Sequence, residues 1–202
     1  MSIITLSGLD GSGKSTQIEL LKDYLKSQDK TFFYFHEAKS SVSSLYKTLP
    51  IFSWRKTKEK AKKDEGITKA NWIEIQLRKI ALMIDICRFR RLMKKKKVDY
   101  IISDRYFYDS VVNIKYLNRR HRMSTMFAEK YIPKPDFAFY IDAKPETIMQ
   151  RERKPDQGME YLVAKEKLFK QKIKDWNMIV VDGEKNKEEI FEDIKQLTLS
   201  LS

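Results

Sequence analysis

Short apolar runs alternate with longer segments of helical spacing along almost the whole chain. Five of these runs have the length of a buried strand, at residues 3–6, 30–35, 98–103, 137–142 and 178–181. Continuous apolar runs, as opposed to strict alternation with polar residues, are typical of parallel strands that are covered on both faces. The pattern therefore predicts a parallel sheet buried between layers of helices.

Between these runs, apolar positions recur with the spacing of amphipathic helices. The predicted helices lie at residues 17–25, 70–92, 111–117, 145–149, 161–176 and 190–197. Pro145 suits the first turn of its helix, where its missing N–H has no partner to lose. Strands that alternate with helices in this way predict an α/β fold with three layers, a five-stranded parallel sheet carrying helices on both faces.

Two segments break the regular pattern. Residues 39–66 are poorly periodic, rich in Ser and Lys, and contain Pro50 and Gly66. Because long irregular segments in compact domains are often functional, we expect a substrate-side insertion there. Residues 151–160 are charged and punctuated by Pro and Gly, which favours a hinged lid, with an exposed charged turn as the alternative. With 202 residues, we expect one domain that includes both segments.

A glycine-rich stretch, residues 8–16, follows the first strand and precedes the first helix. Its glycines, together with Lys14 and Ser15, satisfy the spacing of the phosphate-binding loop. Glycines let successive N–H groups surround phosphate oxygens, and the positive end of the helix adds to that field. Lys14 would reach the β- and γ-phosphates of ATP, while Ser15 would bind Mg²⁺. The predicted ATP-binding residues are Gly8, Asp10, Gly11, Ser12, Gly13, Lys14, Ser15 and Thr16.

Polar residues follow the second and third strands, at the edge where open α/β sheets bind ligands. Asp104 ends the third strand and suits Mg²⁺ or its water, while the adjacent Arg105 suits a phosphate. The alternative is a salt-bridged pair that caps the next helix. Glu37 follows the second strand and is a candidate for holding Mg²⁺, its water or a substrate hydroxyl.

Composition adds a strong positive charge. Forty-one Lys and Arg residues against 28 Asp and Glu residues give a formal charge of +13. We favour solvated surface lysines over a nucleic-acid-binding surface, because no DNA- or RNA-binding module is recognisable. The single cysteine, Cys87, excludes an internal disulfide and fits a reducing compartment. With no membrane-spanning run and no cleavage signal, we expect a cytoplasmic enzyme without membrane contact.

These residues resemble the thymidylate kinases, a family of P-loop nucleoside monophosphate kinases. The resemblance rests on residues 8–17, on the Asp104-Arg105-Tyr106 sequence and on the order of elements over nearly the whole chain. It implies the P-loop kinase fold, transfer of the γ-phosphate of ATP to a deoxynucleoside monophosphate such as dTMP, a requirement for Mg²⁺, small-molecule nucleotides as partners, and a homodimer.

The resemblance also implies roles for single residues. The family's loop aspartate, here Asp10, touches the acceptor, and the arginine of Asp-Arg-Tyr holds the acceptor phosphate. Gly11 stands where some members carry a catalytic arginine, so the arginines are expected from the lid. The implied catalytic residues are Lys14, Arg105, Arg151 and Arg153; the acceptor-binding residues are Asp10, Glu37, Arg88, Arg105 and Tyr106; the metal-binding residues are Ser15 and Asp104.

The chain departs from the family at positions that recognise the acceptor. Residues 36–40 read His-Glu-Ala-Lys-Ser where members usually carry Arg-Glu-Pro-Gly-Gly, and Asp109 replaces a common serine. Arg88 or Arg78 aligns only loosely with the family's base-contacting arginine. Kinase chemistry is therefore better supported than thymidine specificity. A kinase for another nucleotide, or for a nucleoside with Glu37 as base, and a nucleic-acid-binding P-loop ATPase stay as alternatives.

Overall fold

The computed structural model describes residues 1–36, 72–118, 127–151 and 155–199. Its five strands are β1 (Ser2–Gly8), β2 (Phe32–His36), β3 (Tyr100–Asp104), β4 (Phe137–Asp142) and β5 (Ile179–Asp182). They form one sheet in the order β2-β3-β1-β4-β5, and every neighbouring pair is parallel. The predicted strand boundaries agree with these to within two residues at each end.

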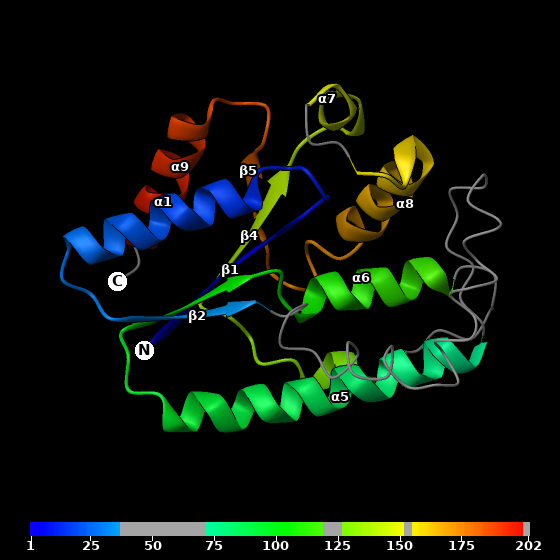
Figure 1. Ribbon diagram of the computed structural model, residues 1–202, viewed down its shortest axis with the longest axis horizontal. Helices are drawn as coiled ribbons and strands as arrows, with labels where there is room; N and C mark the ends of the chain where they lie inside the picture. Colours follow the sequence, from blue (N-terminus) through cyan, green and yellow to red (C-terminus); the bar gives the residue numbers. More distant parts are fainter. Residues whose placement is uncertain (37–71, 119–126, 152–154, 200–202) are drawn as a thin grey trace.

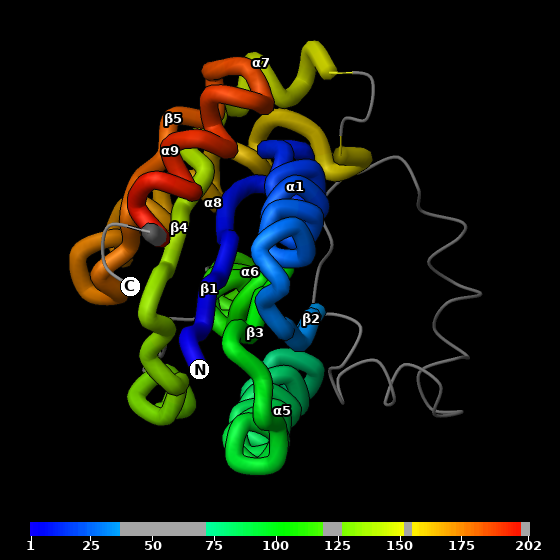
Figure 2. The backbone as a smooth tube through the Cα atoms, turned by 90° about the vertical axis from the view of Figure 1, so that its left-hand side faces the viewer, coloured from blue at the N-terminus to red at the C-terminus, as the bar shows by residue number. Residues whose placement is uncertain are grey.

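Helices cover both faces of this sheet (Figures 1 and 2). They are α1 (Lys14–Ser27), α5 (Trp72–Lys95), α6 (Phe107–Leu117), α7 (Pro145–Gln150), α8 (Gly158–Lys170) and α9 (Lys187–Leu199), with a short 3₁₀ helix, η2, at Phe127–Tyr131. Helices α1 and α9 lie on one face, and α5, α6 and α8 lie on the other. The predicted three-layer α/β fold is confirmed.

The core has two halves, because successive strand residues point to opposite faces of the sheet. Ile4 and Leu6 of β1 face α1 and α9, where they pack against Ile18 and Ile194. Ile3, by contrast, belongs to the half that packs under α5, α6 and α8. Both faces of the strands are therefore buried, which explains why the strand segments read as continuous apolar runs.

One helix ends earlier than predicted. The apolar spacing predicted a helix through residue 176, but α8 ends at Lys170 and residues 171–177 form turns. The N–H of Lys172 donates to the carbonyl oxygen of Phe169 at 2.7 Å, and Asn177 has a φ of 50°. A left-handed residue ends helical geometry, so the chain turns there and enters β5.

The beginning of α8 also changes the boundary of the predicted lid. Residues 158–160, assigned to the lid from their composition, form the first turn of α8. The predicted insertion at 39–66 lies outside the described residues. Within the described part of the chain, no helix is long and apolar enough to cross a bilayer.

The topology brings the ends of β1 and β3 to the same edge of the sheet. In the ladder between these strands, Leu6 of β1 pairs with Asp104 of β3. The glycine-rich loop leaves β1 two residues later, at Gly8, whose φ is 151°. A Cβ atom at Gly8 would lie 2.9 Å from the carbonyl oxygen of Ile141, so only glycine fits this close approach to β4. The loop is thereby held beside Asp104.

Candidate active site

The phosphate loop lies between β1 and α1, with Lys14 as the first residue of the helix. Gly11 and Gly13 have left-handed φ values of 86° and 100°, which bend the loop over the end of the sheet. The Lys14 ammonium donates to the carbonyl oxygens of Leu9 at 2.6 Å and Gly8 at 3.1 Å. Burial lowers the pKa of Lys14 to about 8, although Asp109 and Asp10 oppose this shift. A cation is thus held inside the loop.

Three other side chains of the loop lie near Lys14 or at the start of α1. The Ser12 side chain is buried, and its hydroxyl lies 3.5 Å from the Lys14 ammonium. Ser15 and Thr16 are exposed in the first turn of α1, where N–H groups without helical partners make the helix end attractive to anions. The structure therefore brings Lys14 and the two hydroxyls to one end of the helix.

Ser15 of α1 and Asp104 of β3 contact each other through their side chains. The Ser15 hydroxyl donates to Oδ2 of Asp104 at 3.2 Å, and the Tyr34 hydroxyl lies 3.3 Å from the same oxygen. Burial, together with the charge of Asp104, raises the pKa of Tyr34 to about 12, so Tyr34 keeps its proton. A hydroxyl and a carboxylate side by side are hard oxygen ligands of the kind that Mg²⁺ takes together with phosphates and water.

This pair fits a metal that arrives with a nucleotide. No group of three or more His, Cys, Asp or Glu side chains that could hold a metal occurs among the residues that the structure describes. Mg²⁺ commonly uses one or two protein ligands, with substrate phosphates and waters completing its shell. Ser15 and Asp104 meet that requirement.

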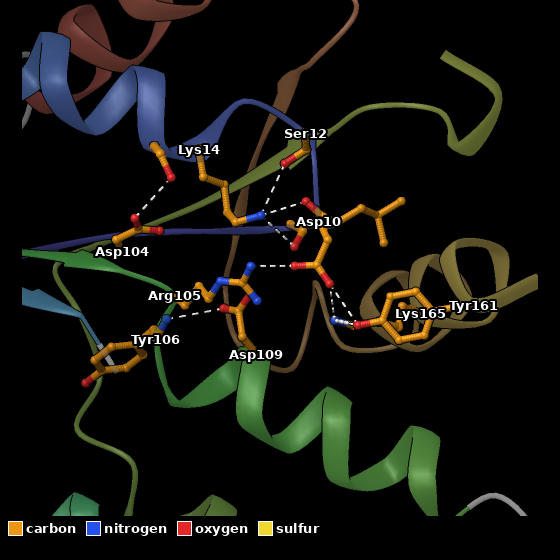
Figure 3. A network of polar contacts seen from close by, with 12 residues as sticks. Asp10, Ser12, Lys14, Asp104, Arg105, Tyr106, Asp109, Tyr161 and Lys165 are labelled. Carbon is orange, nitrogen blue, oxygen red and sulfur yellow. Dashed lines mark hydrogen bonds and ion pairs between the residues drawn. The ribbon is translucent and has the colours of Figure 1, made fainter. Parts of the chain in front are cut away.

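Arg105 faces the loop because its backbone adopts an unusual conformation. Its φ of 59° is left-handed, which is uncommon for a residue with a side chain and is often found at functional sites. Nη2 of Arg105 lies 2.6 Å from Oδ1 of Asp10 (Figure 3). Burial opposes ionisation of Asp10, but Lys165, Arg105 and Lys14 outweigh it and hold the pKa of Asp10 far below its usual range. Asp10 is therefore a carboxylate with several cations around it.

Two of the side chains around Asp10 come from α8 and were not predicted as site residues from the sequence. The Tyr161 hydroxyl donates to Oδ2 of Asp10 at 2.8 Å, and the Lys165 ammonium donates to the Tyr161 oxygen at 3.0 Å. Lys165 also lies 3.5 Å from Oδ2 of Asp10. Lys165 follows Tyr161 by four positions, so the two side chains share a helix face. That spacing was the available signal, but it does not say which part of the chain the face meets.

Arg151, at the end of α7, reaches the phosphate loop. One guanidinium nitrogen donates to the carbonyl oxygen of Gly11 at 2.6 Å, and the other donates to that of Gly183 at 3.1 Å. An arginine from the predicted lid is thus docked on the loop. The other two predicted site residues from irregular segments, Glu37 and Arg153, lie outside the described residues.

Tyr106 does not lie at the surface of the site, although it was predicted to contact the acceptor. Its side chain is fully buried, and its hydroxyl donates to the carbonyl oxygen of Pro133 at 2.6 Å. Its ring packs against Phe89 and Phe107. The physical reason is its position at the start of α6, where the side chain turns into the core below the sheet.

Asp109, one of the departures from the family pattern, is buried beneath the site. Its Oδ2 accepts hydrogen bonds from the Ser7 hydroxyl at 2.6 Å and from the N–H of Tyr106 at 3.2 Å. Burial raises the pKa of Asp109, with Lys14 as the main opposing charge. Its contacts tie the start of α6 to β1, so it supports the segment that presents Arg105.

Arg88 lies on α5, beside β2. It lines a cleft of about 210 Å³ together with Phe33, Tyr34, Phe35, Asp85, Phe89 and Leu92. Its side chain is about half exposed, and one guanidinium nitrogen lies 3.7 Å from Asp85. Tyr34 joins this cleft to Asp104, because its hydroxyl lies within hydrogen-bonding distance of that carboxylate. Arg88 stays a predicted acceptor-binding residue.

Comparisons with known proteins find similarity to thymidylate kinases. No protein-family model matches the chain. It is 28% identical over 198 residues to a protein named probable thymidylate kinase 1 from Saccharolobus solfataricus, covering 94% of this chain and 93% of that protein. It is 27% identical over 213 residues to the thymidylate kinase of Thermosipho africanus, covering 96% of each.

A solved structure has the same fold. The thymidylate kinase of Candida albicans matches with a TM-score of 0.67 at 18% identity, over 98% of this chain and 91% of that one. The fold agrees with this structure, and the sequence agrees with several relatives over nearly its full length. The chain, with Lys14 and Ser15 in its phosphate loop and Asp104 and Arg105 beside them, is therefore similar over nearly its full length to proteins named thymidylate kinase and has the fold of one of them.

Proposed function

We propose that this protein transfers the γ-phosphate of ATP to dTMP, forming dTDP, with Mg²⁺. The observation that carries the proposal is the meeting of the phosphate loop with Asp104 and Arg105 at one edge of the sheet. Such a site has a donor side, at Lys14 and Ser15, and an acceptor side, at Asp10 and Arg105. Relatives over nearly the full length carry the name thymidylate kinase.

On the donor side, Lys14 would move from the loop carbonyls onto the phosphates of ATP. Ser15 and Asp104 would hold Mg²⁺ with the nucleotide. When bound there, Mg²⁺ would supply positive charge to offset the negative charge of the phosphates. Arg151 contacts Gly11 of the loop, which supports a role for its guanidinium in neutralising charge on the transferring phosphoryl group.

On the acceptor side, Arg105 is the residue suited to a phosphate. Its guanidinium is about one-third exposed, while the Asp10 carboxylate beside it is less so. A nucleotide phosphate is mostly ionised at neutral pH, so the attacking oxygen needs no strong general base. The protein's contribution is then to position two substrates and to neutralise charge. We assign no catalytic base.

The direct test is a coupled assay of ADP release with ATP, Mg²⁺ and each nucleoside monophosphate in turn. We expect dTMP to give the highest kcat/KM. If no monophosphate stimulates ADP release, the proposal is wrong. Turnover of thymidine that is lost in a Glu37→Gln variant would favour a nucleoside kinase instead, because a hydroxyl acceptor needs a base.

We also propose that the protein is a homodimer that pairs through α5. Three isoleucines on this helix, Ile73, Ile80 and Ile84, are 63%, 57% and 42% exposed. With the partly exposed Leu77 and the exposed Cys87 they form a stripe whose spacing alternates between four and three residues. That spacing is the seam of paired helices, and a second copy of the same stripe is self-complementary.

Light scattering after size exclusion tests the dimer. We expect the mass of a dimer for the natural protein and of a monomer for an Ile80→Glu, Ile84→Glu double variant. Arg90→Glu, an exposed change on α5 outside the stripe, is the matched control and should leave the dimer intact. A natural protein with the mass of one chain would refute this part of the proposal. Cys87, the only cysteine of the sequence, is a free thiol, which supports a reducing, cytoplasmic location.

A further inference from the structure

Lys165 is a buried cation that the proposed reaction does not use. Only 1% of its side chain is exposed, although lysine is almost never fully buried unless its charge is paired. It comes from the second turn of α8 and points toward the phosphate loop (Figure 3). Burial lowers the pKa of Lys165, and Asp10 and Asp109 oppose that shift. The charged groups that act on Lys165 are therefore residues of the candidate active site.

The two oxygens of Asp10 have different partners. Oδ2 faces α8, where it accepts from Tyr161 and lies 3.5 Å from Lys165. Oδ1 faces Arg105 at 2.6 Å, but it is buried and accepts no aligned hydrogen bond from any described residue. The α8 side is thus a hydrogen-bonded arrangement, while the Arg105 side is a charge contact. Arg105 is therefore the partner that can leave Asp10 while the contacts from α8 stay in place.

Binding of a phosphorylated acceptor creates a competition for Arg105. Its guanidinium now faces Asp10, and the proposed function requires it to hold the acceptor phosphate. A buried carboxylate that loses its cation is strongly destabilised, because its charge is then uncompensated in a poorly solvated place. Without a second cation, Asp10 would hold Arg105 back from the phosphate.

We propose that Lys165 is the permanent counter-ion of Asp10, and that it frees Arg105 to bind the acceptor phosphate. This inference rests on the proposed function. Lys165 acts through Asp10 and Tyr161 and is a positioning residue, since its ammonium is buried and contacts no position open to substrate.

The test compares Lys165→Met with Lys167→Met, a change of the same type at an exposed position of α8. We expect Lys165→Met to raise the KM for dTMP by roughly ten- to hundred-fold, the usual effect of losing a hydrogen bond to a charged group. The KM for ATP should change by no more than about twofold. A structural role alone would change both constants together or reduce the amount of folded protein.

A double-mutant cycle with Asp10→Asn tests whether Lys165→Met raises the KM for dTMP through Asp10. If Lys165 acts through the charge of Asp10, Lys165→Met should cause little further rise in the KM for dTMP once Asp10 is neutral. Additive effects of the two changes would overturn the inference. Tyr161→Phe gives an independent test in case Lys165→Met does not fold, because it removes only the hydroxyl between Lys165 and Asp10; it should also raise the KM for dTMP selectively.

The outcomes separate this inference from the proposed function. If the natural protein phosphorylates dTMP and both Lys165→Met and Tyr161→Phe behave like Lys167→Met, this inference is wrong and the function stands. If the natural protein phosphorylates no monophosphate, the function is wrong and the inference falls with it.

Discussion

The Ser15 hydroxyl lies 3.2 Å from the Asp104 carboxylate, although 89 positions separate the two residues in the sequence. The contact exists because β1 and β3 are adjacent parallel strands, with Leu6 opposite Asp104. The loop that follows β1 then returns α1 to the same edge of the sheet. A hydroxyl and a carboxylate from two distant segments are thus brought together, and they are the two protein groups that we propose for Mg²⁺.

The first prediction concerns this pair. Asp104→Ala should raise the Mg²⁺ concentration needed for half-maximal activity by roughly ten- to hundred-fold, because one of two protein groups for the metal is lost. The measurement is ADP release against free Mg²⁺ at fixed ATP and dTMP. Asp23→Ala, an exposed change on α1, serves as control. If the Mg²⁺ requirement is unchanged in Asp104→Ala, Asp104 does not bind the metal. In the natural protein, chelation of Mg²⁺ should abolish turnover.

The second prediction concerns the charge of Lys14. Since burial lowers its pKa to about 8 in the unliganded protein, the ammonium is increasingly neutral above that pH. ATP attracts only the protonated form, so the affinity for ATP should fall as the pH rises from 7.5 through 9, an interval around the cited pKa. Titration calorimetry with a non-hydrolysable ATP analogue measures this. Lys14→Met should bind weakly at every pH and lose the dependence; a natural protein with constant affinity across this range would contradict the assignment.

The third prediction concerns Arg151. Arg151→Ala removes two donors, to Gly11 and Gly183, and should lower kcat roughly hundred-fold, the usual effect of losing a donor that stabilises developing charge. The KM values should change less, because the interaction strengthens in the transition state. Steady-state kinetics of Arg151→Ala and Arg153→Ala show which lid arginine carries the effect. A large loss in Arg153→Ala alone would move the role to that residue.

The fourth prediction concerns acid stability. The pKa of Asp10 is lower in the folded protein than in the unfolded chain, so its ionisation stabilises the fold above about pH 4. That contribution, roughly 1–3 kcal/mol, should be lost as the pH falls from 4 toward the folded pKa. Urea unfolding between pH 5 and pH 2 should show a steeper loss of stability in the natural protein than in Asp10→Asn. Parallel pH profiles would mean that Asp10 is not held as a carboxylate by its neighbours.

The strands, most helices and the phosphate loop could be predicted because their signals are local. A parallel strand covered on both faces needs a continuous apolar run, and the run at residues 137–142 matches β4 residue for residue. The loop needs glycines where its φ values are left-handed, as at Gly11 and Gly13. The end of α8 was missed because apolar spacing continues into residues 171–177, which form turns after the helix ends at Lys170.

The partners of the site residues could not be predicted, because they depend on which faces of distant elements meet. Tyr161 and Lys165 lie about 150 positions from Asp10, and nothing in their helical spacing names that partner. The direction of the Tyr106 side chain could not be predicted from the sequence either. It stands next to Arg105 in the sequence, yet it enters the core while Arg105 turns toward the loop.

The sequence by itself determined the order of the elements, the phosphate loop and the residue types available for phosphoryl transfer. It did so because backbone geometry and burial impose patterns on neighbouring residues. Only the tertiary structure decided that Asp10 shares its charge between Arg105 and Lys165, and that Arg151 rests on Gly11. Those pairings follow from the packing of α8 and α7 against the loop, a relationship between distant segments for which a single sequence carries no local signal.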